Sequence, residues 1–311
     1  MLLNREVILA KIETSYGVDS LPVPASDAVL VQSASWSNEG LRMIERDVLK
    51  PTLGKEQQVY AGALKSVTFD VELKGSGVAG TPPEIGVLLR MCAMSETIAV
   101  GVSVTYDVVS DSSTQESGTI YFYHEGLVHK LTGCRGTVTG NLETGNYGVL
   151  SFTFTGHSSN PTDAAAPASA VFDQTLPPAL LGVNFTVGGF SAAVNAISID
   201  MGIEVTTPAQ ISAVNGYGEV SITNRDVNGT IDPLMTSVAE NDFIGDFTSG
   251  TKMLMDTGVI GSTAGNRYQV QMPAIYYRDI TPGDRDGIRT YDIPYGAVES
   301  AGDDEITIIF T

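Results

Sequence analysis

The sequence has few of the residues that mark disulfide-rich proteins, cysteine-based metal sites or nucleic-acid binders. It contains only two cysteines, Cys92 and Cys134, among 311 residues, so neither a disulfide framework nor a cysteine-based zinc site is expected. Lysine and arginine number 17 against 36 acidic residues, which gives a net charge of −19. Because binding to phosphates needs clustered positive charge, this balance argues against a general nucleic-acid binder.

Long apolar runs are also missing. No stretch approaches the roughly 20 apolar residues of a membrane-spanning helix. The N-terminal MLLNREVILAK is interrupted by Arg5, Glu6 and Lys11, which does not fit a signal peptide. We therefore expect a soluble protein with no membrane partner. Its hydrophobic content of 42% is enough to build the cores of two domains of ordinary size.

Sequence motifs of catalysis and cofactor binding are absent too. There is no GxxxxGK[ST] phosphate loop, no G-x-G-x-x-G after a strand and no G-x-S-x-G elbow. His124, His129 and His157 lack the HExxH spacing of a zinc-binding helix. The segments DVNG and DRDG, which begin at Asp226 and Asp284, lack the EF-hand spacing, and turn chemistry explains both. We expect no cofactor and no bound metal.

Two pairs of carboxylates remain as candidates for chemistry. Asp70 and Glu72, and likewise Asp200 and Glu204, would share one face of a strand, as the acids of a glycosidase could. The same alternation occurs on any solvated strand face. We therefore expect no enzymatic activity, and we interpret Cys92 as a core residue.

The sequence does contain a pattern that occurs twice. The segment 140–155, GNLETGNYGVLSFTFT, is matched without a gap by residues 296–311, GAVESAGDDEITIIFT. Each copy predicts a turn followed by a strand in which apolar and polar residues alternate. Chance similarity is the alternative interpretation, because any two amphipathic strands share this alternation.

The order of the predicted elements favours a true duplication. Residues 66–74, SVTFDVELK, alternate as a strand, and a short helix is expected over 84–94. Further strands follow up to residue 155. A strand over 196–205, a helix-compatible segment over 237–255 and a last set of strands then repeat this order.

We therefore predict a mainly β protein with two similar domains of β-sandwich or barrel type, each flanked by one helix. The first domain, with an N-terminal arm, comprises residues 1–160, and the second comprises residues 180–311. The segment 161–179 between them is small, polar and rich in proline, which is the composition of a linker.

A long polar segment, 45–63, lies between two predicted strands of the first domain. Its sequence, ERDVLKPTLGKEQQVYAGA, carries charges of both signs and a proline. We expect it to form a hairpin or loop that projects from the body of the protein.

Together these features resemble the major tail tube proteins of tailed phages, especially those with long non-contractile tails. The resemblance rests on VILAKIETSYGVD, IERDVLKPTLGKEQQ, SVTFDVELKGSG before a short helix, and LTGCRGTVTGNLETGNYGVLSFTFTG, and it extends over nearly the whole chain. It implies a small β-sandwich flanked by one helix, copies of which form stacked rings around a channel for DNA. The commonest pattern has one such domain per chain. Two domains per chain would give rings of three chains with pseudo-six-fold symmetry.

The resemblance also implies two working surfaces. Strands joined edge to edge around a ring would satisfy their open hydrogen-bonding edges and turn one acidic, polar face to the lumen, where it repels phosphates. The candidate lumen-facing residues are Thr68, Asp70, Glu72, Ser198, Asp200 and Glu204. The projecting loop would join stacked rings through charge pairs that set their register. Its candidate residues are Arg46, Asp47, Lys50, Lys55 and Glu56.

The implied partners are copies of the chain itself, a tape measure protein, and tail terminator or distal tail proteins. DNA would pass through the lumen without specific binding. The protein would be part of the virion tail after assembly in the host cytoplasm. The alternative is a two-domain β-sandwich adhesin or carbohydrate-binding module of the virion. That alternative predicts exposed aromatic residues on one face, and Trp36 is the only tryptophan.

Overall fold

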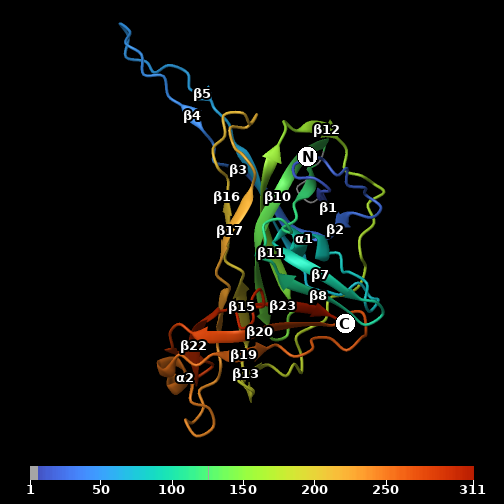
Figure 1. Ribbon diagram of the computed structural model, residues 1–311, viewed down its shortest axis with the longest axis vertical. Helices are drawn as coiled ribbons and strands as arrows, with labels where there is room; N and C mark the ends of the chain where they lie inside the picture. Colours follow the sequence, from blue (N-terminus) through green and yellow to red (C-terminus); the bar gives the residue numbers. More distant parts are fainter. Residues whose placement is uncertain (1–5, 125) are drawn as a thin grey trace.

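The computed structural model describes residues 6–124 and 126–311 (Figure 1). Residues 1–5 of the predicted arm, and Glu125, lie outside the described residues. Strands dominate the described part of the chain, and α-helix is confined there to α1 (Gly86–Met91) and α2 (Phe243–Ser249). The predicted fold class, mainly β, is confirmed.

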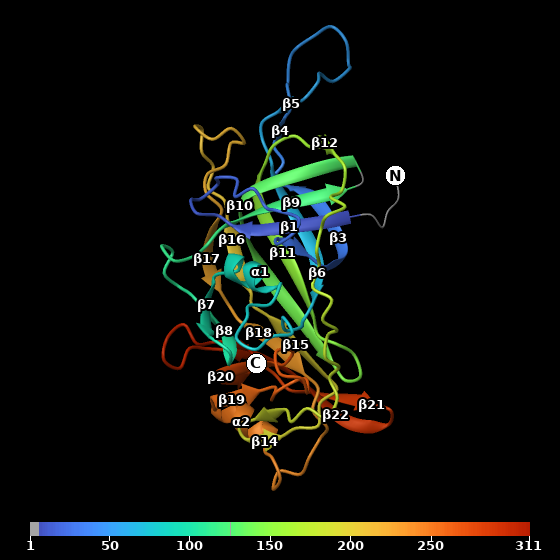
Figure 2. The same cartoon turned by 90° about the vertical axis from the view of Figure 1, so that its right-hand side faces the viewer.

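One connected antiparallel sheet runs through both halves of the sequence (Figures 1 and 2). In the order of their pairing, its strands are β3 (Val31–Glu39), β6 (Leu64–Glu72), β11 (Val149–Ser158), β10 (Gly126–Glu143), β15 (Ala196–Asp200), β18 (Asn228–Ile231), β22 (Ile288–Ala297), β20 (Tyr268–Tyr277), β23 (Thr307–Phe310), β8 (Ser103–Val108) and β7 (Met94–Ala99). The pairing of β23 with β8 brings the end of the chain back to the first half of the sequence.

Shorter strands extend this sheet or form ladders of their own. The extensions are β9 (Gly118–His124), β1 (Glu6–Ile12), β2 (Ala28–Val29) and β12 (Thr162–Ala164) beside the first part of β10, and β19 (Met253–Asp256), β13 (Thr186–Val187), β14 (Phe190–Ser191) and β21 (Thr281–Arg285) beside β20 and β22. The separate ladders are β4 (Met43–Ile44) with β5 (Val59–Tyr60), and β16 (Ile203–Thr206) with β17 (Ser221–Arg225).

Alternation along the strands divides the central sheet into a core face and a polar face. In β6, Val67 and Phe69 are buried, whereas Thr68 between them is half-buried. The ring of Phe69 lies 6.2 Å from that of Phe152 and 5.8 Å from that of Phe154, both in β11. The apolar face of each strand thus packs into one core, as the period-2 pattern predicted.

The two helices are shorter than the segments in which they were predicted. In place of a helix over 84–94, α1 spans Gly86–Met91. In place of a helix over 237–255, α2 begins after Asp242, whose side chain accepts a hydrogen bond from Gly245 N at 2.8 Å. The helix ends at Gly250, which has the left-handed backbone conformation common after helices.

The strand predicted over 196–205 is broken at Gly202. This residue has φ +53°, and a Cβ atom there would lie 2.2 Å from the carbonyl oxygen of Asp226. The chain therefore bends out of the central sheet after Asp200 and continues as β16. The next strand, β17, ends at Arg225, and Asn228 and Gly229, which were interpreted as part of a turn, begin β18.

The two repeated segments, 140–155 and 296–311, have different strand partners. The first forms a hairpin in which β10 and β11 pair directly. In the second, β22 pairs with β18, β20 and β21, whereas β23 lies between β20 and β8. The internal duplication, and the division into domains at residues 161–179, stay predictions.

We expect Phe310→Ala to destabilise the protein by about 3–5 kcal/mol, the usual cost of removing a buried aromatic ring. Phe310 is buried, and its ring lies 5.9 Å from that of Tyr106 in the first half and 6.5 Å from that of Tyr268 in the second. Urea unfolding followed by circular dichroism measures the change. The half-buried neighbour Ile309 is the control, and an equal loss of stability in Ile309→Ala would contradict this packing of β23.

Candidate functional site

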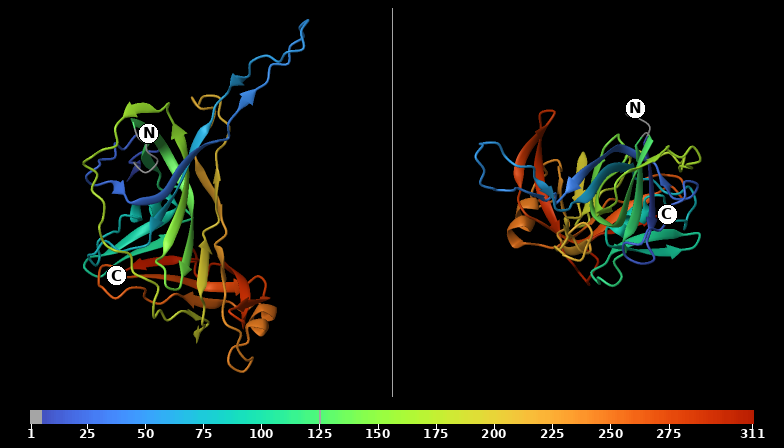
Figure 3. Two further views of the ribbon diagram at one scale, coloured as in Figure 1. Left: turned by 180° about the vertical axis from the view of Figure 1, so that it is seen from behind. Right: turned by 90° about the horizontal axis from the view of Figure 1, so that it is seen from above.

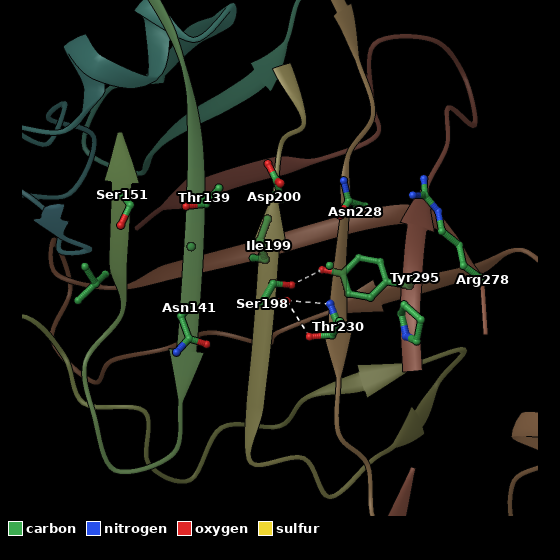
Figure 4. A pocket seen from close by; sticks show the side chains of 14 residues that line it. Thr139, Asn141, Ser151, Ser198, Ile199, Asp200, Asn228, Thr230, Arg278 and Tyr295 are labelled. Carbon is green, nitrogen blue, oxygen red and sulfur yellow. Dashed lines mark hydrogen bonds between the residues drawn. The ribbon is translucent and has the colours of Figure 1, made fainter. Parts of the chain in front are cut away.

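Polar residues predicted separately in the two halves of the sequence lie in one row on the central sheet. Across five neighbouring strands, this first row consists of Asp70, Ser151, Thr139, Asp200 and Asn228. Figure 4 shows its course from Ser151 to Asn228. Asp70 and Asp200 are therefore on the same surface, with only two strands between their own.

A second row runs beside the first. It consists of Glu72, Val149, Asn141, Ser198 and Thr230. Residues two positions apart on a strand share a face, as do residues directly opposite each other on neighbouring strands. The two rows therefore form one polar surface, which we call the polar sheet face, and Val149 is its only apolar member.

The residues between the two rows point into the core. Val71, Leu150 and Ile199 occupy the intervening positions on three of the five strands, and all three are buried. The strands thus have one side that stabilises the fold and one side that is free for function. The polar sheet face is slightly hollow, with a depression of about 500 Å³ over its centre.

Hydrogen bonds within the polar sheet face hold its side chains in place. The Ser151 hydroxyl donates to the Asp70 carboxylate. The hydroxyls of Ser198 and Thr230 lie 2.8 Å apart, and Asp200 accepts from Gly202 N at 2.8 Å. The two aspartates thus lie among hydroxyl and amide groups on this surface.

The far side of the depression is formed by Tyr295 and Arg278 (Figure 4). The Tyr295 hydroxyl donates to the carbonyl oxygen of Ser198 at 2.8 Å, and burial raises the pKa of this hydroxyl, which keeps it neutral. Arg278 donates to Asp226, and this hydrogen bond raises the pKa of the guanidinium group. The positive charge of Arg278 is thus already paired within the chain.

The structure places the other two candidate lumen residues differently. Thr68 lies opposite Thr153 of β11, at a hydroxyl to hydroxyl distance of 3.2 Å, one row beyond the polar sheet face. Glu204 lies on β16, opposite Asn224 of β17, and is exposed. The bend at Gly202 separates it from Asp200, so the shared face expected for these two acids does not extend across the bend.

Sequence reasoning missed the contribution of β10 and β18 to this surface. Thr139 and Asn141 come from β10, whose polar residues alternate over TVTGN. That alternation was a usable signal for a polar strand face. Asn228 and Thr230 were not predicted as members of a polar strand face, because their segment was interpreted as a turn.

Of the segment 45–63 that was predicted to project, Val59 and Tyr60 form β5, and residues 45–58 form a loop beyond the β4–β5 ladder. These residues 45–58, from here on the projecting loop, extend from one end of the molecule (Figures 1 and 3). Lys50 and Glu56 pair at 2.8 Å, and Lys55 lies 3.7 Å from Glu45. Arg46, Asp47 and most of the other loop residues are exposed. Some of the charged side chains predicted to contact the next ring therefore form ion pairs within the loop itself.

The loop also carries two aliphatic side chains that sequence analysis did not single out. Leu49 and Leu53 are fully exposed, at 105% and 106% of the reference area. Aliphatic groups so completely in water favour a contact with another molecule over a role in the fold.

His129 and Trp36 have structural roles. The His129 ring lies 4.8 Å from that of Trp36 at an interplanar angle of 35°, and its Nδ1 lies 2.6 Å from Lys65 Nζ. Burial and the neighbouring Lys65 lower the pKa of His129 to about 4. The Lys65 ammonium group also lies 4.2 Å above the Trp36 ring. Trp36 is therefore engaged within the chain.

Two further features bear on the class of the protein. Among residues 6–124 and 126–311, no cluster of three or more potential metal ligands occurs. No helix in the same part of the chain has the length and apolar character to cross a membrane.

Comparison with known proteins identifies a family. Residues 4–297 match the sequence profile of a family described as phage tail tube protein. A comparison with curated proteins gives no match. Because the family match extends over most of the 311 residues, the chain belongs to the phage tail tube protein family, whose members are structural components of the virion that assemble into a tube.

Proposed function

We propose that the protein is a tail tube subunit whose polar sheet face lines the DNA channel and whose projecting loop joins one ring to the next. The alignment of Asp70 and Asp200 in one row across the central sheet carries this proposal. A channel needs a continuous surface that offers DNA no strong contact. Here, apart from Val149, the side chains of the surface carry hydroxyls, amides and carboxylates, and the nearby guanidinium of Arg278 is paired with Asp226.

The charge of this surface suits passage of a polyanion. Asp70 and Asp200 contribute negative charges that repel phosphates, whereas the charge of Glu72 is partly offset by Lys74, 3.7 Å away. The whole chain carries −19. Catalysis is not part of the proposed function. DNA would slide through the channel without specific binding.

Edge strands supply a way to close the ring. On one side of the central sheet, β3 pairs only with β6 among the described residues, so its other edge can pair with a neighbouring chain. Such pairing removes the open hydrogen-bonding edge that would otherwise invite aggregation. We propose rings of three chains with pseudo-six-fold symmetry, in which each chain contributes two tube-type halves.

In the virion, the tube would belong to a long tail of the non-contractile type. The chain would contact copies of itself, a tape measure protein inside the tube, and tail terminator or distal tail proteins at its ends. Assembly would take place in the host cytoplasm.

Electron microscopy of the concentrated, purified protein tests this function. We expect rings and tubes, and a native mass of three chains for an isolated ring. A ring of six chains would overturn the pseudo-six-fold arrangement but not the tube. Protein that forms neither rings nor tubes, and that is missing from purified virions, would overturn the function itself.

A further inference from the structure

A second protrusion lies beside the projecting loop. The β16–β17 ladder ends in a tip, residues 207–218, which reaches the same end of the molecule as β4 and β5 (Figures 1 and 3). The projecting loop comes from the first half of the sequence and the tip from the second. Both protrusions are therefore positioned to contact a molecule that binds at that end.

Specific contacts fasten the tip to the base of the projecting loop. The Tyr217 hydroxyl donates to the carbonyl oxygen of Gly40. The guanidinium of Arg42 lies 4.0 Å above the Tyr217 ring and donates to the carbonyl oxygen of Gly216 at 3.2 Å. Gly62 is approached so closely that a Cβ atom there would lie 2.1 Å from the carbonyl oxygen of Asn215. The two protrusions are thus held in a fixed relation.

The tip is ordered by its own backbone. Gln210 N donates to Gly216 O at 3.1 Å, Ala213 N to Gln210 O at 3.2 Å, and Gly216 N to Ala213 O at 3.0 Å. On this turn, Ile211 and Val214 are fully exposed, at 105% and 103% of the reference area. The tip therefore presents two aliphatic side chains from an ordered support, which lowers the entropy cost of binding.

The charge of the tip indicates the kind of partner. Residues 205–218 contain no Asp, Glu, Lys or Arg, in a chain with a net charge of −19. Two copies of so acidic a chain repel each other over most of their surface. An uncharged, aliphatic protrusion can contact another copy without that repulsion, and it lies beside the loop that carries Leu49 and Leu53.

We propose that Ile211 and Val214 form a second, apolar contact with a copy of this chain in the next ring, and that Arg42 and Tyr217 position this contact relative to the projecting loop. The inference rests on the proposed function, because it assumes stacked rings. Two separate contacts on each chain restrict the rotation of one ring on the next more tightly than the projecting loop alone.

The double variant Ile211→Ser/Val214→Ser tests the contact. Because both side chains are exposed, the midpoint of thermal unfolding should match that of the unmodified protein. The protein concentration needed for tube formation should rise at least about tenfold, since two aliphatic groups no longer leave water on stacking. Light scattering and electron microscopy measure this concentration, and Ser212→Ala on the same turn is the matched control. Tube formation by the double variant at the concentration of the unmodified protein would overturn the inference.

Photo-crosslinking gives a second test that does not require tubes. Both native cysteines are fully buried, so a benzophenone maleimide added to Ile211→Cys reacts at the tip. After irradiation of concentrated protein, we expect products of two linked chains. If only single chains are recovered, the tip does not contact a second copy. Two-chain products without any rings or tubes would support the contact and count against the tube function instead.

Discussion

Replacing residues 45–58 by an Asn-Gly turn is expected to abolish tube formation and to leave the monomer folded. The β4–β5 ladder ends at the pair Ile44 and Val59, which a two-residue turn can join. The excised loop buries little surface of the body. Its two half-buried residues, Lys50 and Glu56, pair with each other. The midpoint of thermal unfolding should therefore change by no more than a few degrees, while electron micrographs should show no tubes.

A second variant keeps the full length of the loop but removes its charges. It shows whether tube formation depends on the length of the loop or on its charged side chains. The variant carries Arg46→Gln, Asp47→Asn, Lys50→Gln, Lys55→Gln and Glu56→Gln. Exposed ion pairs contribute only about 0–1 kcal/mol each, so this protein should still form tubes, with a weaker dependence on salt. Tubes from the loop-deleted protein would show that other surfaces hold the rings together.

The alternation of apolar and polar residues was enough to predict strands, but not their partners. Val67 and Phe69 are buried and Thr68 is not, as the period-2 pattern required. Pairing depends on contacts between distant segments, which alternation does not encode. The repeated segment with Ile308 and Phe310 therefore looked like a copy of the hairpin at 140–155, yet it pairs with β20 and β8.

Backbone geometry at single glycines accounts for other differences. Gly202 lies within a run of alternating residues that predicted one strand over 196–205. It adopts φ +53° and turns the chain out of the sheet. Gly250 likewise ends α2 within the segment 237–255, which was predicted to be compatible with a helix. A glycine permits such a conformation but does not require it, so these two bends could not be read from the sequence alone.

The candidate channel residues were predicted from their polar side chains, but their alignment on one surface depends on the register of the paired strands. Asp70, Glu72, Ser198 and Asp200 were chosen because they are the polar members of two amphipathic strands. No pattern in the sequence indicated that the two strands belong to one sheet. Their alignment comes from β10, which pairs with β11 on one side and with β15 on the other. One long strand thus joins the polar faces of the two halves.

Reversing two charges of the polar sheet face should turn a surface that repels DNA into one that binds it. The variant Asp70→Lys/Asp200→Lys changes the charge of each chain by +4. In water, a close charge pair contributes about 1 kcal/mol, so two removed repulsions and two added attractions, about 4 kcal/mol together, should raise affinity for duplex DNA on the order of 10³-fold at low salt. Fluorescence anisotropy of a labelled duplex measures it. The gain should fall steeply as salt rises, because it depends on the release of counterions.

The position of the charges, more than their number, should decide this result. Asp163→Lys/Glu240→Lys makes the same change of charge at exposed sites outside the polar sheet face. Asp70→Asn/Asp200→Asn removes the negative charges and keeps the size of the side chains. We expect little DNA binding by Asp163→Lys/Glu240→Lys and only a small gain in DNA affinity for Asp70→Asn/Asp200→Asn. The electrostatic attraction of DNA is strongest where positive charges lie together on one surface. If Asp163→Lys/Glu240→Lys binds DNA as tightly as Asp70→Lys/Asp200→Lys, net charge alone governs the interaction. In tubes of the lysine variant, DNA should be retained in the channel, since a surface that binds phosphates opposes the sliding that the two aspartates allow.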